Sequence, residues 1–511
     1  MTATPPPRRA ALPAFLMTLL LAACAAACAA AFDEPAAHAA IPVRNDPWPP
    51  AWQDSPQSSD VDFTPPVFQP PSASHCHRLP SMREVPGGGE QQGMGWRRGR
   101  ETELSRDAMA PRRSEAGGAV AAPPLAESRA PAAKSAAPLA DKVTGGFAPP
   151  PWPSQPQPEL RRPVNPVVTA GMVDDNADFG EYLAYRQRSG HLSVRERDIS
   201  ERYLLEVTDA QGYPVHDAEV AVQRPGVAQP VMWARTDTAG RVWLHPRAFM
   251  SPELNGERML GVAVRKGSMQ SRALLTRGQP QAVQVRLGSS AAAPMRLDLV
   301  FLIDATGSMG DEIAKLKNSM RAMAQQISQL PGQPDICYGL VAYRDRGDAF
   351  ITRTHDFTDD LGAFQQQLAN VQAHGGGDTP EALNEALHEV VHGLSWRAQA
   401  ARMVVLVADA PPHLDYGGPQ YDRDMQAALS KGIKLFAVGA SGLDPVGEYI
   451  YRQMAQYTAG RFVFLTYRDA ANPGSGPGTQ TVHDVKQYSV QTLDKLVVRL
   501  VGEELARLKH G

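Results

Sequence analysis

The stretch RLDLVFLIDATGSMGDE, residues 296–312, decides the fold class of the second half of this 511-residue chain. It starts with an almost continuous apolar run, which is typical of a strand covered on both faces. The run ends at Asp304, and a short loop with two glycines leads into an apolar stripe with helical spacing. The stripe consists of Ile313, Leu316, Met320, Met323 and Ile327. A covered strand that passes through a tight loop into a helix predicts an α/β sheet.

The same pattern recurs through the C-terminal part of the chain. The runs ICYGLVAYRD, ARMVVLVAD and IKLFAVGAS are also nearly continuous, and helical patterns separate them. Strands that alternate with helices predict a mostly parallel, doubly wound, Rossmann-like sheet over residues 295–511. In such sheets, ligands bind at the carboxyl ends of the strands. Two of these runs end in aspartate at that position, Asp304 and Asp409.

Oxygen-bearing side chains gather at these predicted strand ends. Asp304 is followed by the hydroxyls of Thr306 and Ser308. The segment HGGGDTPEAL places Thr379 before a helix predicted to begin at Pro380, and VLVADAPPH supplies Asp409. Carboxylates and hydroxyls without a nearby thiolate favour Mg²⁺, or Mn²⁺ or Ca²⁺, over Zn²⁺. Since Mg²⁺ retains water ligands, one position stays open for a carboxylate of a protein partner.

This arrangement resembles the von Willebrand factor A (VWA) domain with its metal-ion-dependent adhesion site, from about Arg296 to the C-terminus. The pattern of that site is Asp-x-Ser/Thr-x-Ser, a distant Thr, and a second Asp after a buried strand. The resemblance implies metal ligands at Asp304, Thr306, Ser308, Thr379 and Asp409. It also implies a non-enzymatic module that binds a protein ligand through the cation. Pro411-Pro412-His413 follows the second Asp where integrin-type domains carry Gly-Glu, so an integrin-like switch does not follow.

Two alternatives to a metal-dependent binding module stay open. The loop residues could serve only as helix caps, as Ser, Thr and Asp often do, in a structural envelope protein without a metal. The second alternative is a zinc metallopeptidase, because the stretch HEVVH carries the signature of His388, Glu389 and His392.

The helical pattern argues against the peptidase. Leu383, Ala386, Leu387, Val390 and Leu394 share one face, so both imidazoles lie nearly opposite, together with Glu381 and Glu385. We expect that second face to meet water, whereas a zinc protease needs both imidazoles in a cleft beside a third ligand. The only candidate close in sequence for a third ligand is His413.

The tripeptide Arg346-Gly347-Asp348 matches a motif that some integrins recognise. Arg, Gly and Asp are also ordinary turn residues between strands. The sequence does not decide between display and coincidence.

The four cysteines do not suggest a disulfide framework. Cys337 lies in an apolar run and is expected to be a buried thiol. The HCH triplet at 75–77 has the wrong spacing for a closed metal site.

The N-terminus predicts export. PPPRRAALPAFLMTLLLAAC has two arginines, an apolar core too short to span a bilayer with ease, and a terminal Cys24. It resembles a lipoprotein signal peptide at 1–23, with Cys24 as the lipidated first residue. That implies a lipid anchor in the outer membrane of the cell envelope, with the body periplasmic or surface-exposed. An ordinary signal cleaved near Ala31 is the alternative.

Three regions separate this signal from the α/β domain. Residues 24–165 are rich in Pro and Ala and predict a disordered stalk. Residues 166–199 predict a connector. Residues 200–288 contain short alternating runs that predict an antiparallel β-sandwich, with a resemblance to carboxypeptidase-regulatory modules in VTDAQGYPVHDAEV. The net charge of −3 gives no reason to expect nucleic acid as a partner.

Overall fold

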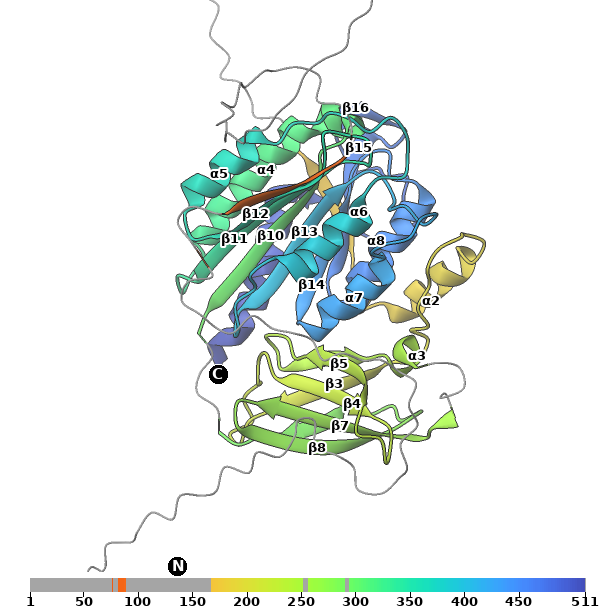
Figure 1. The fold of residues 1–511 in the computed structure, drawn as a ribbon, viewed down its shortest axis with the longest axis vertical. Helices are drawn as coiled ribbons and strands as arrows, with labels where there is room; N and C mark the ends of the chain where they lie inside the picture. Colours follow the sequence, from red (N-terminus) through yellow and green to blue (C-terminus); the bar gives the residue numbers. More distant parts are fainter. Residues whose placement is uncertain (1–75, 77–80, 89–166, 251–255, 290–293, 511) are drawn as a thin grey trace, which may run out of the picture.

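The computed structural model describes residues 76, 81–88, 167–250, 256–289 and 294–510. They form an α/β domain and a smaller β-sandwich packed against one end of it (Figure 1). The predicted signal peptide, Cys24 and most of the predicted stalk lie outside these residues. No helix within the described ranges has both the length and the apolar character that a membrane span requires.

A mixed ten-stranded sheet forms the centre of the α/β domain, in the order β1-β12-β11-β10-β13-β14-β15-β2-β17, with β16 paired to β15. Its central strands run parallel, as the covered apolar runs predicted. These strands are β10 (Arg296–Asp304), β11 (Asp335–Tyr343), β13 (Ala401–Ala408), β14 (Ile433–Gly439) and β15 (Arg461–Asp469). The edges are antiparallel, with β12 (Phe350–Thr358) beside β11 and the hairpin strand β16 (Asn472–Pro477) beside β15.

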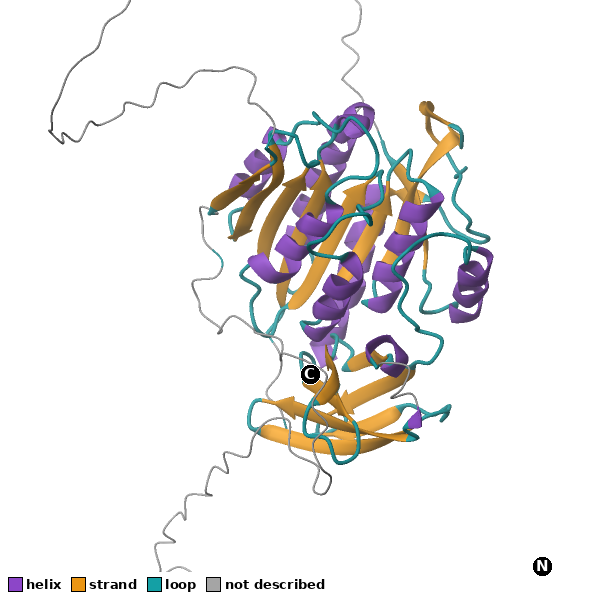
Figure 2. Cartoon of the chain, turned by 45° about the vertical axis from the view of Figure 1, so that its right-hand side comes forward, coloured by secondary structure: helices purple, strands orange, loops and turns teal. Residues whose placement is uncertain are grey.

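Helices cover both faces of this sheet (Figure 2). One face carries α4 (Gly310–Ser328), α5 (Leu361–Asn370) and α9 (Leu493–Ala506). The other carries α6 (Leu383–His388), α7 (Tyr421–Ser430) and α8 (Pro445–Tyr457). The whole apolar stripe of α4 is buried against the sheet. The predicted Rossmann-like α/β class is therefore confirmed.

Segments from the predicted stalk and connector complete the sheet. Strand β1 (Met82–Pro86) pairs antiparallel with β12, so the prediction of a disordered stalk is wrong for this stretch. Strand β2 (Thr169–Val173), followed by α2 (Phe179–Arg188), lies between β15 and the short β17 (Gln491–Thr492). Backbone pairing with an open sheet edge orders a segment whose composition alone predicts none.

A disulfide joins Cys76 to Cys337 on β11, across 261 residues of sequence. The prediction that Cys337 is a free buried thiol is therefore wrong. Its partner belongs to the HCH triplet, which the sequence analysis set aside. The bond ties the chain just before β1 to the centre of the sheet.

The sandwich consists of two small sheets and a short helix, α3 (Pro246–Phe249). The first sheet contains β6 (Arg241–Leu244), β3 (Tyr203–Thr208) and β9 (Val283–Arg286). The second contains β5 (Pro230–Arg235), β4 (Glu219–Gln223), β7 (Met259–Lys266) and β8 (Met269–Thr276). All neighbours are antiparallel except β3 and β9, which run parallel, so the expectation of a purely antiparallel sandwich is wrong at this pair.

The sandwich docks at the amino ends of the parallel strands. Asp217 accepts hydrogen bonds from Arg402 at the start of β13 (2.9 Å) and from Arg235 (2.8 Å). Lys434 at the start of β14 contacts Asp237 at 2.9 Å and Glu504 at 2.7 Å. The opposite edge of the sheet, where the parallel strands end, is therefore free of the sandwich.

Candidate metal centre

Four of the five predicted ligands meet at that free edge. Asp304 ends β10, and its Oδ1 accepts from both the backbone N–H (2.9 Å) and the hydroxyl (2.7 Å) of Thr306. The Thr306 hydroxyl lies 3.0 Å from the Ser308 hydroxyl, which donates to Asp409 at 3.0 Å. The tight turn Gly307–Met309 at the start of α4 aims these side chains at the end of β13. Carboxylates 105 residues apart in sequence are thus joined through two hydroxyls.

A glycine-rich loop closes over this group. The N–H of Gly307 donates to the carbonyl of Gly375 at 2.8 Å. Gly376 has a positive φ of 58°, and a Cβ there would lie 2.9 Å from the Cβ of Thr306 and 2.6 Å from Oε1 of Glu381. Only glycine permits both this backbone conformation and this close approach.

Glu381 is a buried acid beside this group that was not among the predicted ligands. The sequence placed it on a water-facing helix face, but its side chain is buried and its Oε2 lacks a hydrogen-bond partner among the described residues. The helix begins at Leu383 rather than at Pro380, because the backbone of Glu381 pairs instead with Pro411 and His413 just beyond β13. The sequence signal that could have identified Glu381 was an acid immediately before the apolar face of a helix.

The electrostatics of the cluster are those of a site that lacks positive charge. Burial, and then repulsion from Asp409, raises the pKa of Asp304 to about 7. Burial also raises the pKa of Asp409. Burial, and then the charges of Asp304, Asp345, Asp348 and Asp409, raises the pKa of Glu381 to about 9. Across the described part of the chain, no salt bridge reaches Asp304, Asp409 or Glu381, so a divalent cation fits the charge and the all-oxygen donor set.

The fifth predicted ligand is placed differently. Thr379 is exposed on the glycine-rich loop and takes no part in the hydrogen bonds that join the other four. Its role as a ligand stays a prediction. Asp378 beside it is also exposed.

The rim of the site contains the integrin-like tripeptide. Asp348 accepts from the N–H groups of Asp345 (3.1 Å) and Gly376 (2.9 Å), so it supports the glycine-rich loop. Arg346 pairs with Glu385 at 2.7 Å and lies over the ring of Tyr416, 3.5 Å from its centroid. Arg346 and Gly347 are nevertheless exposed, so these internal contacts do not decide whether the tripeptide is displayed.

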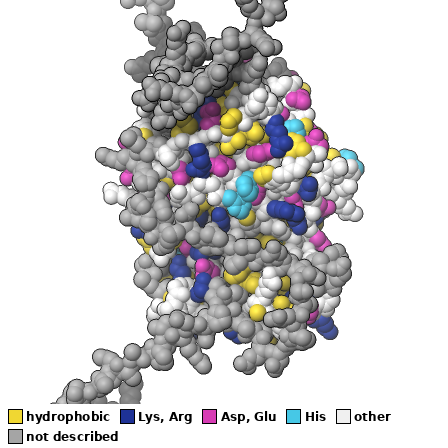
Figure 3. Space-filling model, in the orientation of Figure 1, with side chains coloured by type: hydrophobic (Ala, Val, Ile, Leu, Met, Phe, Trp, Pro, Cys, Tyr) yellow, Lys and Arg dark blue, Asp and Glu magenta, His cyan; other side chains and the backbone are white. Residues whose placement is uncertain are grey.

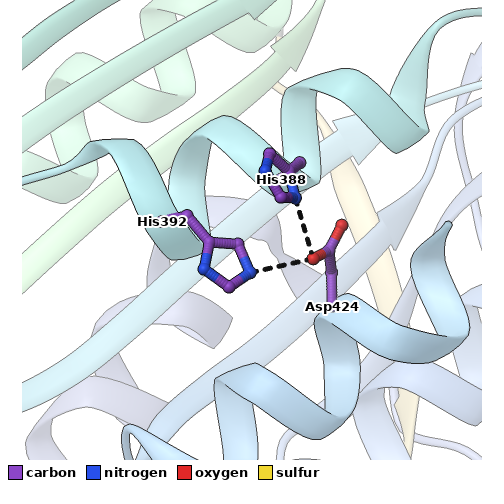
Figure 4. A group of neighbouring side chains, drawn as sticks. All are labelled: His388, His392 and Asp424. Atoms are coloured by element: carbon purple, nitrogen blue, oxygen red, sulfur yellow. Dashed lines mark hydrogen bonds and ion pairs between the residues drawn. The ribbon is translucent and has the colours of Figure 1, made fainter. Parts of the chain in front are cut away.

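The two histidines of the zinc-protease signature lie on the flank of the domain (Figure 4). Both imidazoles are partly exposed, as the helical pattern predicted, yet both contact the carboxylate of Asp424 on α7. His413, the candidate close in sequence, lies past the end of β13 and contacts Asp345 at 3.0 Å, so the carboxylate beside the two imidazoles is that of Asp424. Helix packing brings α7 beside α6, which sequence spacing does not reveal.

Comparison with known families agrees with this geometry. Residues 298–471 match the family model of the von Willebrand factor type A domain. These residues form a VWA domain. The VWA domain thus includes the ends of β10 and β13, Glu381, and helices α4 to α8.

Two curated proteins and one solved structure illustrate the similarity. Alpha-protein kinase vwkA of Dictyostelium discoideum is 29% identical over 119 residues, which are 23% of this chain and 19% of that protein. Human von Willebrand factor A domain-containing protein 7 is 39% identical over 89 residues, which are 17% of this chain and 9% of that protein. The conserved hypothetical protein BatB from Bacteroides thetaiotaomicron aligns over 100% of its chain and 42% of this one, with 12% identity and a TM-score of 0.28. The chain spans less than a fifth of the length of either curated relative.

Proposed function

We propose that this protein is a non-enzymatic binding module whose VWA domain captures a protein ligand through a divalent cation, most naturally Mg²⁺. One observation carries the proposal: Asp304, Thr306, Ser308 and Asp409 form a continuous oxygen cluster, and no Arg or Lys of the described residues pairs with its carboxylates. A buried set of acids without compensating charge is costly unless a cation binds. By contrast, two other buried carboxylates of the domain have an arginine partner: Asp298 pairs with Arg397 at 2.7 Å and Glu448 pairs with Arg452 at 3.4 Å.

The protein supplies the ligands, and the cation supplies the link to the partner. Asp304 and Asp409 provide the negative charge, Thr306 and Ser308 provide hydroxyl oxygens, and Glu381 is a further carboxylate within the cluster. Mg²⁺ retains exchangeable waters in such sites. A carboxylate on the partner replaces one of them, so the ligand class is a protein with an exposed Asp or Glu.

The rim of the site selects the partner. His413 lies next to Glu381 through a backbone hydrogen bond, and its ring contacts Tyr416, over which Arg346 lies. Arg346 and Tyr416 are groups that contribute strongly to protein interfaces. The cation therefore provides attachment, and this rim provides specificity.

The test starts with the metal alone. Calorimetry is expected to show one Mg²⁺ per chain, lost in Asp304→Ala and kept in Asp378→Ala, which removes an exposed acid of the same loop. Envelope proteins are then captured on the immobilised chain in Mg²⁺ and in EDTA. Capture that is indifferent to EDTA and to Asp304→Ala contradicts the proposal, and absence of Mg²⁺ binding favours a structural protein without a metal.

The location belongs to the same proposal. Cys24 anchors the chain in the outer membrane, and the Cys76–Cys337 disulfide supports an oxidising compartment such as the periplasm or cell surface. Radiolabelled palmitate is expected to label the native chain and not Cys24→Ala. Equal labelling of both chains contradicts the anchor.

A further inference from the structure

We propose that His388, His392 and Asp424 form a second metal site, for a borderline cation such as Zn²⁺, that joins α6 to α7. This site is separate from the acidic cluster in place and in chemistry. The two imidazoles come from α6 and the turn that follows it, and the carboxylate comes from the first turn of α7 (Figure 4).

The donor atoms already converge. Nδ1 of His388 lies 3.1 Å and Nε2 of His392 lies 3.0 Å from the same oxygen, Oδ1 of Asp424. The coordinating atoms all lie within 4.8 Å of one another. Ligand atoms of a tetrahedral Zn²⁺, each about 2.1 Å from the ion, are about 3.4 Å apart. A small outward movement of the imidazoles is therefore enough to admit the ion.

The local backbone contributes to this convergence. Residues Glu389–Gly393 form a π-helical turn, a feature that is often found at functional sites. His388 precedes this turn and His392 lies within it, so their rings face the same neighbour, with centroids 4.4 Å apart.

The three side chains differ in burial, and the side of the site formed by the two histidines stays open to solvent. The Asp424 side chain is 5% exposed, whereas those of His388 and His392 are 48% and 40% exposed. Histidine side chains are visible at the surface of the face that carries α6 and α7 (Figure 3). The second oxygen of Asp424, Oδ2, is buried and has no hydrogen-bond partner among the described residues. A bound ion thus receives three protein ligands and keeps a solvent-facing position.

The donor types select a different metal from the one proposed for the acidic cluster. Two imidazole nitrogens and one carboxylate suit Zn²⁺ and related transition metals, whereas hydroxyls and carboxylates suit Mg²⁺. The two sites can therefore be filled independently.

The structure assigns this site a role in holding two helices together, not in hydrolysis. A zinc protease uses the glutamate of the signature as its general base. Here Glu389 forms an ion pair with Arg83 of β1, and Arg83 also donates to the carbonyl of Gly393. The acid is therefore engaged by the edge strand of the sheet.

Calorimetric titration of ZnCl₂ into the full chain without a histidine tag, in excess Mg²⁺, tests the proposal. We expect one tightly bound Zn²⁺ per chain and a rise in the thermal midpoint. His388→Gln and Asp424→Asn are each expected to weaken Zn²⁺ at least tenfold. His191→Gln, at an exposed histidine near the end of α2, serves as the matched control and binds as the native chain does.

Two results separate this site from the acidic cluster. Asp304→Asn is expected to lose Mg²⁺ and keep Zn²⁺, and Co²⁺ is expected to give the intense visible absorption of a four-coordinate site only when His388 is present. Absence of saturable Zn²⁺ binding, or binding that both ligand substitutions leave unchanged, overturns the proposal and leaves three hydrogen-bonded side chains.

Discussion

Both ends of the central sheet bury carboxylates, but among the described residues Asp217 at the sandwich end is paired with arginines, whereas Asp304, Asp409 and Glu381 at the other end have no Arg or Lys partner. There, burial raises the pKa of Asp217, but the charges of Arg402 and Arg235 outweigh burial and hold that pKa well below its usual range. Burial also acts to raise the pKa of Asp237, but the charge of Lys434 outweighs burial and lowers that pKa. At the opposite end, burial and mutual repulsion raise the pKa of Asp304 and Glu381. The same residue types thus pair with cations at the domain junction and form the proposed ion-binding site at the other end, according to the charges placed beside them.

The largest expected effect is at the junction. In Asp217→Asn, asparagine tolerates the positive φ of 55° as aspartate does. The substitution removes the negative charge that balances Arg235 and Arg402. We expect the free energy of unfolding to fall by about 3–5 kcal/mol, because the buried guanidinium of Arg402 loses its carboxylate partner. Arg235 also loses its contact with Asp217 but keeps the one with Glu219. Urea unfolding measures this loss. Asp359→Asn, at an exposed acid, is the control, and equal midpoints for the two variants contradict the comparison.

At the opposite end, the cation is expected to supply the missing charge. Mg²⁺ at one hundred times its dissociation constant is predicted to stabilise the folded protein by about 2.7 kcal/mol. Asp304→Asn is expected to lose this gain, whereas Asp217→Asn keeps it despite its lower stability. Urea midpoints in Mg²⁺ and in EDTA measure both. If Mg²⁺ still stabilises Asp304→Asn, the cation binds at another site.

The next effect concerns pH at the junction and is smaller over any single pH unit. His245 is buried against Tyr457 with ring centroids 5.0 Å apart, and burial, followed by the charge of Arg202, lowers its pKa from 6.5 to about 3. Below pH 6.5 the unfolded chain binds a proton there that the folded chain does not. The free energy of unfolding is therefore expected to fall between pH 6.5 and 3, by at most about 1.4 kcal/mol per pH unit from this group.

His245→Phe keeps the ring and removes the titration. The slope of stability against pH is expected to be shallower in this variant than in the native chain. His191→Gln is the control and keeps the native slope. Identical slopes for all three proteins would show that His245 does not cause the pH dependence of stability.

The smallest expected effect is a rise in the free energy of unfolding, opposite to the fall expected at the junction. Glu381→Gln removes an acid whose raised pKa means that it must take up a proton when it is buried at neutral pH, so in EDTA the free energy of unfolding is expected to rise by about 1 kcal/mol. In Mg²⁺ the same variant is expected to gain less from the cation than the native chain does. Thermal midpoints in the two buffers measure this, with Asp378→Asn as the control on the same loop. Destabilisation of Glu381→Gln in EDTA means that this acid is structurally paired.

The sequence by itself determined the α/β domain and the chemical character of one site. Continuous apolar runs, helical stripes and the loop after Asp304 are local patterns, and backbone periodicity translates such patterns directly into strands and helices. The rule that ligands bind where parallel strands end then placed Asp304 and Asp409 at one edge. Thr306 and Ser308 followed, because they lie within four residues of the first aspartate.

Only the tertiary structure decided which distant residues meet. Glu381 joined the acidic cluster because its backbone pairs with the segment after β13, and Asp424 joined the histidines because α7 packs beside α6. Likewise, a disulfide joins Cys76 to Cys337 across 261 residues. Strand β1 pairs with β12 at a sheet edge that a single run of sequence cannot reveal. Hydrophobic periodicity records which face of an element is buried, but not which partner covers it. That choice depends on the packing of the whole chain.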